Sequence, residues 1–101
     1  LVLDRLGRRV WVRGAGPEGG DKDVTLTPKE FIMLEHLMLH AEQVVSRRAL
    51  LARIWHPGAE PGSNVVDAHV ARLRAKLRAA TAAPAIRTER GAGFRITAQP
   101  R

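Results

Sequence analysis

The sequence predicts an α+β fold in which an N-terminal antiparallel sheet (residues 1–26) precedes a three-helix core (27–80) and a C-terminal β-hairpin (84–98). Three observations support this prediction. Apolar and polar residues alternate near both ends, as they do in half-buried strands. In the middle, apolar residues recur at helical spacing behind residues that commonly begin helices. Glycine- and proline-rich segments separate these elements, and 101 residues is the length of a single domain.

The N-terminal sheet is expected to contain three short strands. The stretches LVLD (1–4) and RRVWVR (8–13) have the alternation of strands. GAGPEGGDKD (14–23) is rich in glycine and has no large apolar residue, so we expect a flexible connection there. The stretch VTL (24–26) is then predicted to be the strand that closes the sheet.

The first helix has the clearest start signal in the chain. In LTPKEF, Thr27 fits the N-cap, Pro28 fits the first helical position, and Glu30 completes a capping box. We expect this helix to run to about residue 41. Its apolar face is predicted to consist of Phe31, Leu34, Leu37 and Met38.

Two further helices are expected after it. The extended stretch QVVS ends in Ser46, which fits the N-cap of a second helix that continues to Trp55. The stretch HPGAEPG (56–62) is predicted to be a loop, because its prolines and glycines interrupt any helix. Ser63 or Asn64 then caps a third helix that runs to about residue 80.

The C-terminal segment IRTERGAGFRI (86–96) predicts two strands around a glycine-rich turn. Strands, three helices and a terminal hairpin, in this order, make the winged variant of the helix-turn-helix architecture. Here the connection between the second and third helices is a longer loop.

The charge distribution indicates a polyanionic partner. The net charge is +7, but residues 1–43 hold six Lys/Arg against seven Asp/Glu, whereas residues 44–101 hold eleven against three. Such asymmetry favours nucleic acid or an anionic membrane face, and its alternative is a merely soluble surface. The chain has no cysteine, no apolar run long enough to span a membrane and no signal-peptide pattern. We therefore expect a cytoplasmic protein with no membrane partner and no cofactor.

The third helix has a small outer face with basic edges. Its apolar stripe consists of Val66, Val70, Leu73 and Leu77. The opposite face carries Asn64, Ala68, Ala71, Arg72 and Ala75. The edges carry His69 and Lys76 on one side, Arg74 and Arg78 on the other. A helix that only needs solvation usually carries Glu, Lys or Gln outermost, so this pattern favours close approach to nucleic acid over a solvated surface. Docking of a protein on the alanine face stays an alternative.

Four stretches together resemble a known family. They are LTPKEFIMLEHL, QVVSRRALLARIW, GSNVVDAHVARLRAKL and IRTERGAGFRI. In order and spacing they are similar to the C-terminal effector domain of OmpR/PhoB-family response regulators. The resemblance is close over residues 24–97 and covers residues 1–23 only as a strand-forming segment.

This resemblance implies an architecture and a set of partners. It implies a four-stranded N-terminal sheet, a third helix that enters the major groove of double-stranded DNA, and a wing that reaches the adjacent minor groove. Members bind direct-repeat promoter sites as head-to-tail dimers. They also carry a receiver domain that a histidine kinase phosphorylates. No receiver sequence is present here, so we expect this chain to be the DNA-binding domain of a longer regulator.

The resemblance also implies roles for single residues. Base reading is implied for Arg72, His69 and Ala68. Phosphate contacts are implied for Asn64, Arg74, Lys76, Arg47, Arg48, Trp55 and Thr88. Arg90 of the wing is implied to enter the minor groove. Contact with RNA polymerase is implied for the loop of His56, Pro57, Gly58, Ala59, Glu60, Pro61 and Gly62.

Three residues depart from the family pattern or stand against it. Ala71 lies where many relatives have a basic residue beside the one matched by Arg72, and Phe94 stands where tyrosine is frequent. Glu89 in the wing would repel phosphate if it pointed at DNA. On an alternating strand it is expected to point away from Thr88 and Arg90.

Catalytic and metal sites are the weakest alternatives. His36 and His40 have the i,i+4 spacing of metal ligands, but no third ligand is evident, and solvent-facing histidines are the favoured interpretation. Asp67, His69 and Ser63 cannot form a nucleophile–base chain at these spacings on one helix. The sequence therefore predicts a sequence-specific DNA-binding domain that is not an enzyme.

Overall fold

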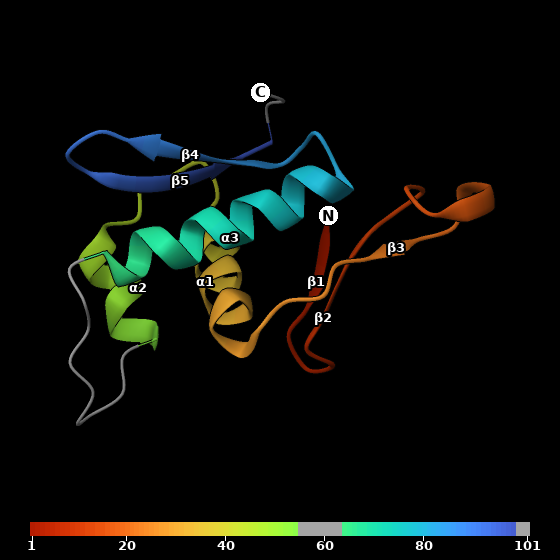
Figure 1. The fold of residues 1–101 in the computed structure, drawn as a ribbon, viewed down its shortest axis with the longest axis horizontal. Coiled ribbons are helices and arrows are strands. Elements are labelled where there is room, and N and C mark those ends of the chain that lie inside the picture. The colour runs from red at the N-terminus through yellow and green to blue at the C-terminus, as the bar shows by residue number, and fades with distance from the viewer. Residues whose placement is uncertain (55–63, 99–101) are drawn as a thin grey trace.

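The computed structural model describes residues 1–54 and 64–98 of the chain. Its elements are β1 (Val2–Asp4), β2 (Arg9–Val12), a 3₁₀ turn (Pro17–Gly19), β3 (Lys22–Asp23), α1 (Pro28–Leu39), α2 (Arg47–Ile54), α3 (Val65–Ala80), β4 (Ala85–Glu89) and β5 (Gly93–Thr97). Figure 1 shows α3 crossing in front of α1, with the β4–β5 hairpin lying along α3. This arrangement confirms the predicted α+β winged helix.

The N-terminal sheet differs from the prediction in its third strand. The order is β1-β2-β3, all antiparallel, and β3 pairs through Trp11↔Asp23 and Val12↔Lys22. The expected strand at 24–26 is therefore wrong, and the 14–23 segment supplies β3 as well as the 3₁₀ turn. Only the Val24 N–H, which donates to the Val10 carbonyl at 2.9 Å, extends the pairing, because the chain leaves the sheet there to begin α1. In the N-terminal sheet, the described residues form three strands, whereas the family resemblance implied four.

Local capping begins α1 and α2 as the sequence predicts. The hydroxyl of Thr27 accepts the Glu30 N–H at 3.2 Å, and the Glu30 carboxylate accepts the Thr27 N–H at 2.9 Å. The Ser46 hydroxyl accepts the Ala49 N–H at 3.0 Å at the start of α2. Asn64 stands at the N-cap of α3 but makes no capping hydrogen bond through its side chain. Ser63, the other candidate cap, lies outside the described residues.

A single core joins the helices to both sheets. The predicted stripe of α3 is buried throughout, at Val66, Val70, Leu73 and Leu77. It packs against Met33, Leu34 and Leu37 of α1, Leu50 of α2, and Ile86, Phe94 and Ile96 of the hairpin. Burial of large aliphatic side chains is the main favourable contribution to such a fold. The core therefore fixes α3 with its opposite face outward.

The wing is held by an added backbone pair. Val45 and Phe94 exchange two hydrogen bonds, with N···O distances of 2.7 and 2.9 Å, so the segment before α2 pairs with β5. Gly93 adopts φ +143°, a region that only glycine enters readily. A Cβ at this position would overlap the Val45 carbonyl. The close approach of these two backbones therefore requires glycine.

A buried carboxylate connects α1 to α3. The side chain of Glu30 is 1% exposed, and its Oε1 lies 2.6 Å from the Lys76 ammonium. Its Oε2 lies 4.0 Å from the Arg72 guanidinium. Burial raises the pKa of Glu30, but hydrogen bonds from Lys76 and from the Thr27 N–H outweigh it, so the pKa is lowered from 4.5. The residue that caps α1 therefore also binds the basic edge of α3.

We expect Gly93→Ala to destabilise the protein far more than Gly91→Ala. The first substitution forces a strained φ and a backbone overlap, at a cost of about 3 kcal/mol or more. The second has φ +74° and open space around it, at a cost of about 1 kcal/mol. Urea unfolding of both variants checks this difference. Equal losses would contradict the docked geometry of the wing.

We expect Glu30→Gln to cost about 1–3 kcal/mol at neutral pH, because glutamine preserves the cap but loses the charged contact with Lys76. A carboxyl whose pKa is lowered on folding contributes stability above its unfolded pKa, near 4.5, and loses it as the pH falls through the folded value. The two proteins should therefore converge in acid.

Urea unfolding at pH 7 and at stepwise lower pH measures this gap. The matched control is Glu35→Gln, which removes a surface pair with Arg5 and is expected to cost less than about 1 kcal/mol. A gap for Glu30→Gln that does not change with pH would refute the role of its charge.

Candidate nucleic-acid interface

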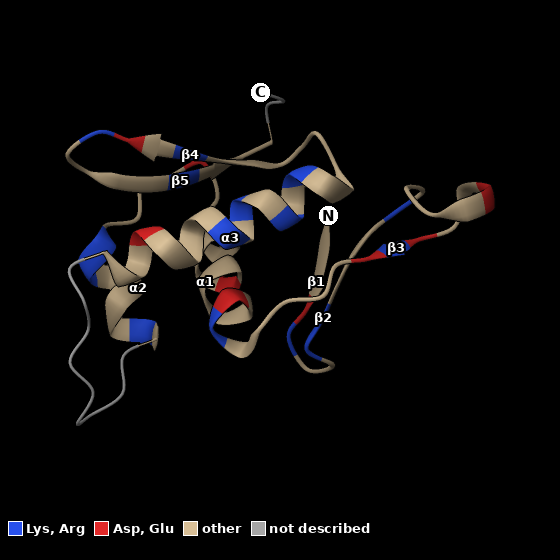
Figure 2. Ribbon diagram, in the orientation of Figure 1, with Lys and Arg blue, Asp and Glu red and all other residues tan. Residues whose placement is uncertain are grey.

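The outward face of α3 is small and uncharged along its centre. Ala71, Ala75 and Ala79 are exposed, Ala68 is half-buried, and Asn64 is exposed at the N-terminal end. Alanine side chains allow the helix backbone to approach another surface closely. Figure 2 shows that Lys and Arg predominate along α3, with a single acidic position near its start.

Arg72 is the long, exposed side chain beside this alanine face. It is 58% exposed, and its one ion pair among the described residues is the 4.0 Å approach to Glu30. His69 is half-buried, and its Nδ1 lies 2.8 Å from the Val65 carbonyl. Since a carbonyl only accepts, Nδ1 is the donor of this hydrogen bond, and in the tautomer that it requires Nε2 is an acceptor. The structure thus brings the three predicted base-reading residues, Arg72, His69 and Ala68, to one side of the outer face.

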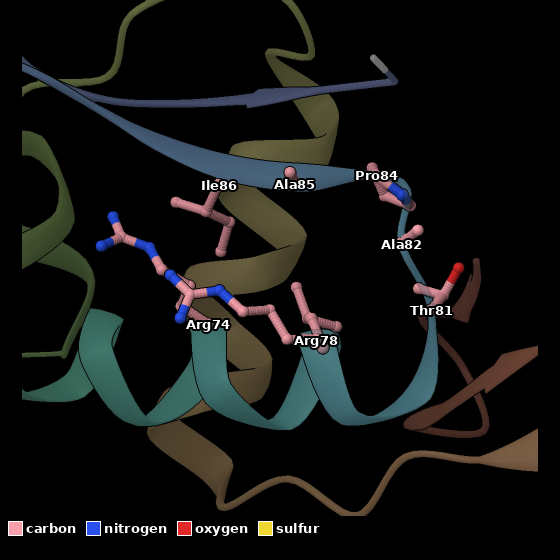
Figure 3. A pocket seen from close by; sticks show the side chains of 8 residues that line it. Arg74, Arg78, Thr81, Ala82, Pro84, Ala85 and Ile86 are labelled. Atoms are coloured by element: carbon pink, nitrogen blue, oxygen red, sulfur yellow. The ribbon is translucent and has the colours of Figure 1, made fainter. Parts of the chain in front are cut away.

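The opposite edge of α3 faces the wing. Arg74 donates to the Thr88 hydroxyl at 2.9 Å, so two predicted phosphate residues are joined to each other. Figure 3 shows Arg74 and Arg78 lying in the space between α3 and β4, where they line a 420 Å³ cavity. The side chain of Ile86 points into the same space from β4. A donor-rich border therefore runs along this edge.

The two arginines at the start of α2 differ in their surroundings. Arg47 forms an ion pair with Asp67 of α3 at 3.0 Å, and its guanidinium lies 4.8 Å from the centre of the Phe94 ring. Asp67 is therefore the partner of an arginine on the neighbouring helix. Arg48 is exposed and makes no ion pair within the described part of the chain. Arg47 therefore joins α2, α3 and the wing, whereas Arg48 faces solvent.

Glu89, the acidic residue of the wing, lies at the end of β4 and points away from α3. Ile86 packs in the core and Thr88 bonds to α3, so alternation places Glu89 on the other face of β4. There its carboxylate lies 2.9 Å from Arg95 of β5. Arg90, in the turn itself, is exposed. The expected orientation of Glu89, away from Thr88, is thus the one observed.

The paired histidines of α1 have a structural explanation. Their rings are 4.6 Å apart, and the His40 Nδ1 lies 3.0 Å from the His36 carbonyl. Burial lowers the pKa of His36, the charges of Arg53 and His40 lower it further, and Glu35 opposes them. Both histidines are half-buried rather than solvent-facing. No cluster of three metal-ligating side chains exists among residues 1–54 and 64–98.

Some predicted and some unpredicted residues complete the site. Trp55 and the loop from His56 to Gly62 lie outside the described residues. Lys76 holds Glu30, so its predicted phosphate role competes with an internal partner. The sequence singled out Glu30 only as a cap and did not single out Lys29 or Arg53.

The described residues contain no helix with the length and apolar character that a membrane span requires.

Comparisons with known proteins agree with this geometry. Residues 21–96 match the family described as "Transcriptional regulatory protein, C terminal". The transcriptional regulatory protein BasR of Escherichia coli is 36% identical over 98 residues, which cover 97% of this chain and 39% of BasR. The chain spans between 30% and 39% of the length of BasR and two other curated relatives.

Solved structures share the fold. The Klebsiella pneumoniae RstA DNA-binding domain, in complex with the RstA box, gives a TM-score of 0.69 at 29% identity and covers 96% of this chain and 90% of its own. The AdeR DNA-binding domain, in complex with an intercistronic region, gives 0.80 at 22% identity, with coverage of 95% and 92%, and shows likeness of fold. The chain therefore belongs to the C-terminal domains of transcriptional regulatory proteins, the effector domains of OmpR/PhoB-type response regulators.

Proposed function

We propose that this domain binds double-stranded DNA sequence-specifically, with α3 in the major groove and the β4–β5 wing in the adjacent minor groove. The observation that carries the proposal is the alanine-lined outer face of α3 between two basic edges. A major groove about 12 Å wide admits one helix, and small side chains let it come close to the base edges. The RstA DNA-binding domain, solved in complex with the RstA box, supports DNA binding by this domain.

Base reading falls to one side chain with two helpers. Arg72 reaches beyond the alanines and is suited to a bidentate contact with guanine. His69 offers Nε2 as an acceptor, and the methyl group of Ala68 suits an apolar contact with thymine. Within the described residues, the 4.0 Å approach to Glu30 is the one ion pair that Arg72 has to exchange when it reaches a base.

Phosphate contacts set affinity and register. The proposed set is Asn64, Arg74, Lys76, Arg47, Arg48, Trp55 and Thr88, with Arg90 in the minor groove. Three of these cations, Arg47, Arg74 and Lys76, already have protein partners, so each must share or exchange a bond when it meets a phosphate. Arg48 and Arg90 have no ion pair to exchange among the described residues. We therefore assign the largest share of salt-dependent affinity to the latter pair.

The longer protein is proposed to be a two-component transcriptional regulator of the cytoplasm. A receiver domain, phosphorylated by a histidine kinase, then controls this domain, which binds direct repeats as a head-to-tail dimer. Residues 56–62 are proposed to contact RNA polymerase. The family match and the greater length of the relatives support these assignments.

A protein-docking module is the second candidate, because alanine faces also suit helix packing. A salt titration distinguishes the two, since DNA binding weakens steeply with salt in proportion to the phosphates contacted. Binding that is insensitive to salt, or absent for duplex DNA, would favour protein docking.

We expect Arg72→Ala to cost about 1–3 kcal/mol on the preferred duplex and to relax base preference at one position. Selection from random duplexes, followed by fluorescence anisotropy on the selected site, measures both quantities. The control is Arg13→Ala, which removes an exposed charge of the N-terminal region, outside α3 and the wing. If Arg72→Ala retained native affinity and preference, another residue would read the base.

We expect Arg48→Gln to weaken binding to all duplex sequences alike and to reduce the slope of log K against log salt by about 1. Titration at several salt concentrations measures the slope. Arg13→Gln, with the same loss of charge, should leave the slope near its native value. An Arg48→Gln slope equal to that of the control would remove Arg48 from the phosphate set.

A further inference from the structure

A basic cavity lies on the edge of α3 that faces away from the wing. It has a volume of 450 Å³ and lies between the start of α1, the end of α2 and α3. Three of its lining residues carry a positive charge, Lys29 of α1, Arg53 of α2 and Arg72 of α3, and His69 of α3 lies beside them. Ile32 and Ile54 supply apolar lining. Three helices, far apart in sequence, therefore bring basic side chains to one concave site.

Among the described residues, no acidic side chain lines this cavity. Arg53 is exposed, Lys29 is half-buried, and neither makes an ion pair within residues 1–54 and 64–98. Glu30, the nearest acid in sequence, directs its carboxylate to Lys76 and Arg72. The positive end of the α1 dipole adds to the same field. The two cations are thus available to an anion from outside.

The cavity and the wing lie on opposite sides of the outer face of α3. Arg72 and Arg74 are two residues apart on α3, so their side chains diverge by about 160–200° around the helix axis. Arg74 faces the wing and Arg72 faces the cavity. In Figure 1 the hairpin lies on one side of α3, and the end of α2 and the start of α1 lie on the other. The outer face of α3 is consequently bordered by two cationic walls.

We propose that the Lys29–Arg53 cavity binds a phosphodiester of the DNA strand opposite the strand that the wing edge contacts. This inference rests on the proposed function, because a helix in the major groove has one phosphate strand along each side. The wing edge, through Arg74 and Arg78, takes one strand. Lys29 and Arg53 take the other, and the partly buried Ile32 lies where the apolar carbons of a deoxyribose can pack.

The test uses Lys29→Gln, Arg53→Gln and the double variant. Neither residue forms an ion pair with an acid of the described residues, so the melting temperatures of all three variants are expected to equal that of the native protein. Because the cavity is proposed to bind one phosphate, the double variant should lower the slope of log K against log salt by about 1 and each single variant by no more than that, with unchanged base preference. Arg13→Gln is the matched control for loss of charge. Single uncharged methylphosphonates, placed along each strand of the selected duplex, locate the contact.

One methylphosphonate, on the strand opposite the wing, should lower the affinity of the native protein for the duplex. The same substitution should leave the affinity of the double variant unchanged. If the double variant keeps the native slope while Arg48→Gln lowers it, the cavity does not bind phosphate, although the DNA-binding function stands. If the native protein shows no salt-dependent binding to any duplex, the proposed function fails. Loss of binding to a labelled polyglutamate peptide by the double variant, with DNA affinity unchanged, would assign the cavity to an acidic protein segment instead and overturn the proposal.

Discussion

The buried carboxylate of Glu30 is the constraint on which the arrangement of α1 and α3 depends. A carboxylate with 1% exposure must be compensated, because an isolated buried charge is far more costly than a paired one. The Thr27 N–H and the Lys76 ammonium compensate it together. The Glu30 side chain therefore caps the N-terminus of α1 and also binds the basic edge of α3.

The cations of the proposed interface are of two kinds, those that bind a carboxylate of the protein and those that do not. Lys76 and Arg47 each bind a carboxylate of the protein, and they hold α3 in place. Arg48 and Arg53 lack such partners in the described part of the chain and lie at the two ends of α2. Formal charge alone would count all four equally. We therefore expect the cations that make no ion pair within the described residues to contribute most to the proposed DNA affinity, because they have no such pair to exchange.

Local signals in the sequence were sufficient for the elements that depend on neighbouring residues. The α1 cap and the buried stripe of α3 are of this kind, since each depends on residues a few positions apart. The Glu30–Lys76 contact spans 46 residues, so no local pattern predicts it. The third strand was misplaced because VTL has the composition of a strand, whereas register with Trp11 placed the pairing at Asp23. The Lys29–Arg53 cavity likewise needs three helices in place before it exists.

The wing is braced at three points, against the segment before α2, against α2 and against α3. Val45 pairs with Phe94 through the backbone, Arg47 covers the Phe94 ring, and Arg74 bonds to Thr88. If α3 and the wing enter adjacent grooves, as proposed, these contacts fix the distance between them before DNA binds. The duplex must then supply the adjustment by bending. Sites with easily deformed pyrimidine–purine steps between the two grooves become cheaper to occupy, so the domain discriminates among sequences at base pairs that it never touches.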